Sequence, residues 1–208
     1  MNYNLDLKYI SIESYKEILK NQNLLPSRRC LLTNIDKYFA ILDKKGINNV
    51  YQLKMLLSTP VKIDAFSLES GIPQDYLIIL KREIGGLEQK PVLLSTFPDM
   101  ENELISKLYL EGIKTSKDYF ESKIKSETDE LYCLCDLVRI NGIGPVAAKM
   151  FFEAGYKSAL AFAKASAEEL LNKITAVNSI NNYYKGNLGL KDMEFCITYA
   201  KLLMRYVK

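Results

Sequence analysis

The sequence predicts an all-α protein. Apolar residues recur at intervals of three and four, for example at Tyr38, Ile41 and Leu42 and again at Leu104 and Leu108. This spacing is typical of amphipathic helices. Long runs that alternate apolar and polar residues, as half-buried strands do, are missing from the 208-residue sequence. Three similar segments, each centred on a glycine, indicate that short helices follow one another through tight turns.

Each of these segments combines a helix end with a new helix start. Gly46, Gly112 and Gly155 can adopt the left-handed conformation that ends a helix. An apolar residue stands four before each glycine and another directly after it, which is the pair that such a helix end buries. Three residues after each glycine comes a good helix-capping residue. The apolar pairs are Leu42 with Ile47, Leu108 with Ile113 and Phe151 with Tyr156, and the caps are Asn49, Thr115 and Ser158.

Other residues predict further helix boundaries and two domains. Pro73 suits the first turn of a helix that ends at Gly85, and Ser166 opens a capping box for another helix. Residues 87–97, which include Pro91, are predicted to form a linker. We therefore expect an N-terminal helical hairpin domain at 1–90 and a C-terminal helical domain at 91–208, packed as two halves.

A two-glycine segment begins at Leu137 and carries the most specific pattern in the chain. Its order is apolar-x-x-apolar-x-Gly-apolar-Gly-x-x-x-Ala, and Pro145 suits the first position of the second helix. The glycines allow a sharp bend that bares backbone N–H groups, and the alanine lets two helices approach closely. The matching residues are Leu137, Ile140, Gly142, Ile143, Gly144 and Ala148. This pattern resembles the helix-hairpin-helix family, with the motif at 137–165, and implies tandem helix-hairpin-helix (SAM-like) units.

In that family the turn often holds a DNA phosphate without reading base sequence. The resemblance implies that Asn141, Gly142, Ile143, Gly144 and Val146 line such a contact. Many members have Lys or Arg where this chain has Val146, so Lys149 and Arg139 are the expected cations. Residues 137–165 hold four basic residues and one acidic residue, a local charge of +3.

Arg28 and Arg29 form a secondary basic candidate near a predicted helix start. Guanidinium groups suit phosphates and carboxylates. The alternative is a surface ion pair, for example with Asp36.

Composition excludes several classes of enzyme. The chain has no histidine, which removes Ser-His-Asp triads, Cys-His pairs and imidazole metal sites. The glycines of the turn lack the spacing of a dinucleotide-binding loop. We expect no catalytic residues, no metal and no cofactor, and we expect the four cysteines to be reduced packing residues: Cys30, Cys133, Cys135 and Cys196.

A second resemblance involves several strings spread along residues 9–205. They include residues 24–29, the hairpin at 39–50, Ser70–Pro73 with Tyr76 and Leu77, and the tail at 184–192. Together they look like the DUF4332 family, a tandem helix-hairpin-helix group of unknown function. This resemblance implies the repeated helical fold and supplies no activity.

The leading functional hypothesis is a non-enzymatic, sequence-nonspecific nucleic-acid-binding module that contacts DNA or RNA phosphates. The rival is a protein-interaction or scaffold module whose hairpins only pack helices. Residues 1–13 lack the apolar core of a signal peptide, and no stretch is apolar enough to span a membrane. We therefore expect a cytoplasmic protein with no membrane contact.

Overall fold

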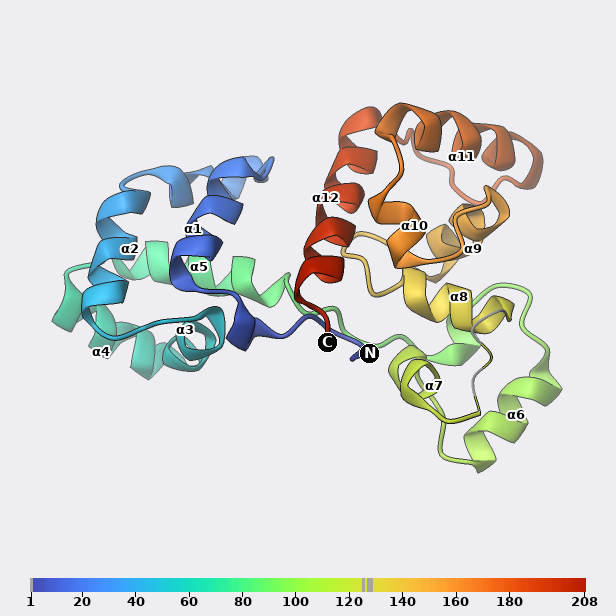
Figure 1. Cartoon of the computed structure of the whole chain (residues 1–208), viewed down its shortest axis with the longest axis horizontal. Coiled ribbons are helices and arrows are strands. Elements are labelled where there is room, and N and C mark those ends of the chain that lie inside the picture. Colours follow the sequence, from blue (N-terminus) through green and yellow to red (C-terminus); the bar gives the residue numbers. More distant parts are fainter. Residues whose placement is uncertain (1, 125, 127–128) are drawn as a thin grey trace. The chain divides into compact units, whose positions relative to one another are not determined.

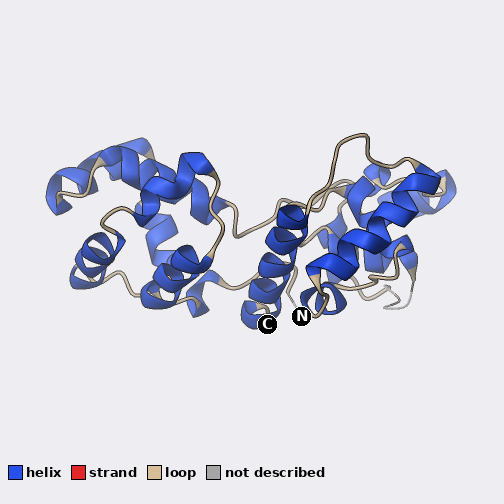
Figure 2. Cartoon of the chain, turned by 90° about the horizontal axis from the view of Figure 1, so that it is seen from above, coloured by secondary structure: helices blue, strands red, loops and turns tan. Residues whose placement is uncertain are grey.

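The computed structural model describes residues 2–124, 126 and 129–208, and it confirms the predicted all-α class (Figure 1; Figure 2). The chain forms two compact units. One, here the inserted unit, is Asp6–Glu88. The other, here the split unit, is Met1–Leu5 with Gln89–Lys208. The sequence places a boundary at residue 90 but does not reveal that the first five residues join the second unit.

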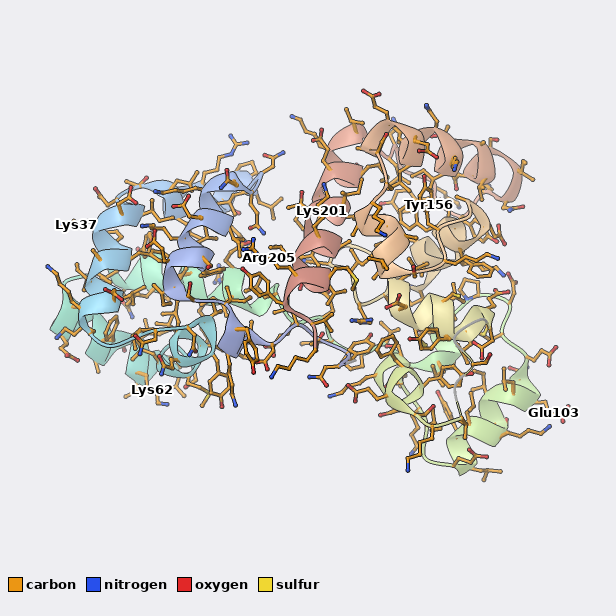
Figure 3. All side chains as sticks on the ribbon, in the orientation of Figure 1. Lys37, Lys62, Glu103, Tyr156, Lys201 and Arg205 are labelled. Atoms are coloured by element: carbon orange, nitrogen blue, oxygen red, sulfur yellow. The ribbon has the colours of Figure 1, made fainter. Side chains whose placement is uncertain are left out.

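The inserted unit is built from short helices around a core that includes Tyr15, Leu19, Phe39 and Leu53. Helices α1 and α2 pack together, as do α4 and α5. The exposed side chains of Lys37 and Lys62 extend from this unit (Figure 3). Its elements are η1 (Leu7–Tyr9), α1 (Ile12–Asn21), η2 (Pro26–Leu32), α2 (Ile35–Lys44), α3 (Val50–Leu56), α4 (Pro60–Ser70) and α5 (Gln74–Gly85).

The split unit contains the remaining helices. Helix α12 packs along α10 and α11, and α8 packs against α7 and α9. The boundary between the two units falls inside the predicted linker at 87–97, between Glu88 and Gln89, while Leu87, Leu94 and Phe97 within it are buried. The elements are η3 (Leu94–Thr96), α6 (Asn102–Leu110), α7 (Ser116–Glu121), α8 (Glu130–Leu137), α9 (Pro145–Glu153), α10 (Ala159–Ala163), α11 (Ala167–Asn181) and α12 (Leu190–Tyr206).

The three glycine-centred turns form as the sequence predicts. Gly46, Gly112 and Gly155 have φ of 79°, 82° and 93°. After each glycine, a backbone N–H donates to the carbonyl five residues earlier, which closes the helix end. These bonds are Ile47 to Leu42 at 3.1 Å, Ile113 to Leu108 at 2.9 Å and Tyr156 to Phe151 at 3.0 Å. The side chains of Asn49, Thr115 and Ser158 cap the helices that follow.

The three turns differ in what accepts the first N–H of the second helix. Val50 donates to the carbonyl of Ile10 at 3.0 Å, and Ser116 donates to the carbonyl of Val92 at 2.8 Å. In the third turn no backbone segment takes this place, and Ala159 donates to the Asp136 carboxylate at 2.8 Å. This carboxylate is buried and therefore needs a further partner.

Candidate functional site

The two-glycine turn links α8 to α9. Gly142 has φ of +92°, whereas Gly144 is extended at φ −88° and serves as the N-cap of α9. Ile143 is buried and anchors the turn, as expected, while Gly142, Gly144 and Val146 stay exposed. No side chain caps the N-terminus of α9 within the described part of the chain. The bared backbone that the sequence predicts is therefore at the surface.

Helix α12 lies directly against this turn. A β-carbon added at Gly142 would be 3.2 Å from Cys196 Sγ and 3.3 Å from Phe195 Cε1. Only a glycine fits there without displacing these neighbours, quite apart from its positive φ. Phe195 remains 42% exposed beside the turn.

Arg139 does not lie at this surface, and its expected role as a phosphate contact is wrong. Its side chain is fully buried and pairs with Asp136. Nε donates to the carbonyl of Tyr3 at 2.6 Å, and a terminal nitrogen donates to the carbonyl of Asn2 at 3.3 Å. The guanidinium lies 4.2 Å from the ring centroid of Phe120. Arg139 therefore joins distant segments of the split unit and cannot meet an external phosphate.

Residues 2–5 pass through the same region, in a pocket that the sequence analysis did not predict. Tyr3 is fully buried; its hydroxyl lies 2.7 Å from Ser116 Oγ, and its ring packs edge-on against Phe120. Its backbone N–H donates to Glu121 Oε1 at 3.0 Å. We call the set Ser116, Phe120, Glu121 and Arg139 the Tyr3 pocket.

Lys149 is close to the turn, but carboxylates surround it. Its Nζ lies 2.5 Å from Glu130 Oε1, 3.7 Å from Glu153 Oε1 and 3.9 Å from Asp99 Oδ2. Burial opposes its charge, but the hydrogen bond to Glu130 and the three acidic groups outweigh this and raise the pKa of Lys149. One positive and three negative charges leave this cluster with a net charge of −2. It therefore does not offer a free cation to a phosphate.

The remaining predicted residues are Asn141, Arg28 and Arg29. Asn141 is half-buried beside the turn. Arg28 and Arg29 belong to the inserted unit. Arg28 pairs with Glu83, so the suggested partner Asp36 is wrong; Asp36 pairs instead with lysines of α1.

The four cysteines differ in their burial. Cys133, Cys135 and Cys196 are buried, as expected of packing residues, and burial raises the pKa of each thiol. Cys30 is exposed, so the expectation of a packing role is wrong at that position. Raised thiol pKa values oppose formation of a nucleophilic thiolate.

The buried phenol of Tyr3 predicts a loss of stability at high pH. Burial raises the pKa of Tyr3 from 10.0 to about 12. An unfolded chain releases this proton near pH 10, whereas the folded chain holds it until about pH 12, so stability falls as pH rises between these values. Relative to Tyr3→Phe, the wild-type chain should lose about 2 kcal/mol over this interval. Urea unfolding of both chains as a function of pH measures the difference, and parallel profiles would contradict it.

The comparisons with known proteins identify one domain family. Residues 121–203 match the family model of a domain of unknown function, DUF4332, which confirms the resemblance for that part of the chain. The segment contains α8 to α11, most of α12 and the two-glycine turn. No curated protein and no solved structure matches the chain. None of the helices in residues 2–124, 126 and 129–208 is both long and apolar enough to cross a lipid bilayer.

Proposed function

We propose that the chain is a non-enzymatic, cytoplasmic protein-interaction module. In this proposal the glycine-centred turns, including the helix-hairpin-helix-like segment at 137–165, hold helices together and do not clamp phosphates. The observation that supports it is the placement of the two cations expected beside the turn. Arg139 is buried against main-chain carbonyls, and three carboxylates surround Lys149.

The exposed residues at the turn include two glycines and two apolar side chains. We define the turn patch as Gly142, Gly144, Val146 and Phe195. Val146 and Phe195 are each 42% exposed. The N-terminus of α9 carries no side-chain cap and keeps N–H groups that need acceptors. A polypeptide that brings an apolar side chain and a backbone carbonyl suits this combination better than a phosphate does.

Sequence-nonspecific binding of DNA or RNA is the second candidate. The uncapped N-terminus of α9 favours it, because such ends attract anions. The net charge of −2 around Lys149 opposes it, since nonspecific affinity comes mostly from cations that neutralise phosphates.

Two measurements on the full chain separate these candidates. Fluorescence anisotropy with duplex DNA, single-stranded DNA and single-stranded RNA should give no salt-sensitive binding at micromolar protein. A photo-crosslinking residue at Val146 should join a protein partner in extracts of the source cells. The same residue at Leu160, which is 50% exposed outside the turn patch, should not.

A matched pair of variants at Val146 tests whether the turn contacts phosphates instead. Val146→Glu adds a negative charge in the first turn of α9, where the helix tolerates it, and Val146→Gln adds a similar shape without charge. Salt-sensitive DNA binding that is lost in Val146→Glu and kept in Val146→Gln would contradict the proposal and support a phosphate contact at the turn.

A further inference from the structure

Residues 2–5 make their contacts in a unit from which the chain then departs. Tyr3 and Leu5 are buried in the split unit, and the chain enters the inserted unit at Asp6. The residues that receive the segment come much later in the sequence: Ser116 lies 113 positions after Tyr3, and Arg139 lies 136 positions after it. Non-covalent contacts therefore hold the segment in its pocket, and more than 100 residues of chain separate the two.

The contacts form a receptor for a short peptide. The pocket supplies an aromatic wall, a hydroxyl for the phenol, a carboxylate for the N–H of Tyr3 and a guanidinium for two main-chain carbonyls. Asn4 adds a bond from its amide to the carbonyl of Gln89 at 3.4 Å. The phenol selects tyrosine, and the donors and acceptors fix the direction of the peptide.

We propose that the Tyr3 pocket also takes residues 2–5 of a second copy of this chain, so that two copies associate by reciprocal exchange of the segment. A second copy is the occupant because it carries the same tyrosine and the same neighbouring backbone. The contacts in the exchanged pair are the same as those within one chain. The equilibrium between the monomer and the exchanged dimer therefore depends on the path of the chain at Leu5 and Asp6 and on protein concentration.

The junction between the units permits such an exchange. Asp6 has an extended backbone at φ −93° and ψ 104°, and it caps η1 through a local bond to Lys8. The hydrogen bonds between residues 2–5 and the pocket lie before this residue, and the bond from the N–H of Tyr9 to the carbonyl of Asp6 belongs to η1 after it. The exchange surface is separate from the turn patch, so this inference goes beyond the proposed function and can fail independently of it.

Trapping between two chains that each carry one introduced cysteine tests the exchange, while the buried Cys133, Cys135 and Cys196 stay in place. One full chain carries Asn4→Cys, the other carries Gln89→Cys, and both carry Cys30→Ser to remove the exposed thiol. The two chains are unfolded, mixed, refolded together at about millimolar concentration and treated with a flexible bis-maleimide. The expected product is a dimer linked between positions 4 and 89, identified by mass spectrometry. Adding Tyr3→Ala to the Asn4→Cys chain should reduce this product about tenfold.

Controls make a negative result informative. Tyr9→Ala makes the same chemical change at a side chain that is 56% exposed, and it should leave the yield of dimer unchanged. A chain with both cysteines should form the link within one molecule when refolded at low concentration. If Tyr3→Ala does not fold, Tyr3→Phe keeps the ring and should still give the dimer. Two results would overturn the proposed exchange. One is a crosslink within single molecules with no crosslink between chains, and the other is an equal yield of dimer with Tyr3→Ala.

Discussion

Replacement of Arg139 by alanine should destabilise the split unit by about 3–5 kcal/mol. Among the residues that the structure describes, the change leaves the buried Asp136 carboxylate with the N–H of Ala159 as its one hydrogen-bond donor. It also removes the donor for the carbonyls of Tyr3 and Asn2 and empties the space beside Phe120. Lysine should not restore stability, because one ammonium cannot reproduce the fork of donors that reaches the carboxylate and both carbonyls.

Urea unfolding followed by circular dichroism measures this loss, and hydrogen exchange of peptides from α8 assigns it to the split unit. Arg205→Ala is the control, because Arg205 is exposed and contacts the ring of its neighbour Tyr206. It should cost less than about 1 kcal/mol. An equally small effect at Arg139 would mean that its guanidinium is not held as described and would restore it as a candidate for external contacts.

The second large effect is expected at Gly142. Gly142→Ala places a β-carbon at φ +92° and brings it 3.2 Å from Cys196 Sγ. The left-handed backbone alone costs about 1–2 kcal/mol for a residue with a β-carbon, and the crowding against α12 adds to it. We expect a total loss of about 2–3 kcal/mol.

Gly144→Ala is the matched control, two residues away in the same turn. Gly144 has φ of −88°, and an added β-carbon meets no described atom within 4 Å. Its effect on the free energy of unfolding should lie within about 0.5 kcal/mol of zero. Thermal and urea unfolding of both variants give the comparison. Equal losses in the two variants would show that the turn does not have this conformation.

The helix–turn–helix segments could be predicted from sequence because their determinants are local. A left-handed glycine, an apolar pair around it and a cap three residues later lie within eight positions, as in the segment from Leu42 to Asn49. Such short-range patterns fix the backbone through their own hydrogen bonds. The same reasoning could not decide which glycine of the two-glycine turn takes positive φ, because contact with α12 depends on Phe195 and Cys196, more than 50 positions later.

The prediction that Arg139 and Lys149 face a phosphate at the turn missed their real partners for a related reason. Arg139 is a charged residue beside a turn. The sequence alone does not show that its guanidinium donates hydrogen bonds to the carbonyls of residues 2 and 3. One local signal pointed to burial: Asp136, an opposite charge three residues earlier in an otherwise apolar stretch. For Lys149, Glu153 at four residues' distance was a comparable signal, whereas Asp99 and Glu130 come from other segments.

The interruption of one unit by the other sets an order for folding on the ribosome. Residues 6–88 emerge as one continuous stretch and can become compact while translation continues. Residues 2–5 emerge before them but stay without Ser116 and Arg139 until those positions are translated. A newly made chain therefore holds an unsatisfied tyrosine segment until Arg139 has been translated. On a polysome, where neighbouring nascent chains are crowded, this delay is the period in which the segment is free to meet another chain.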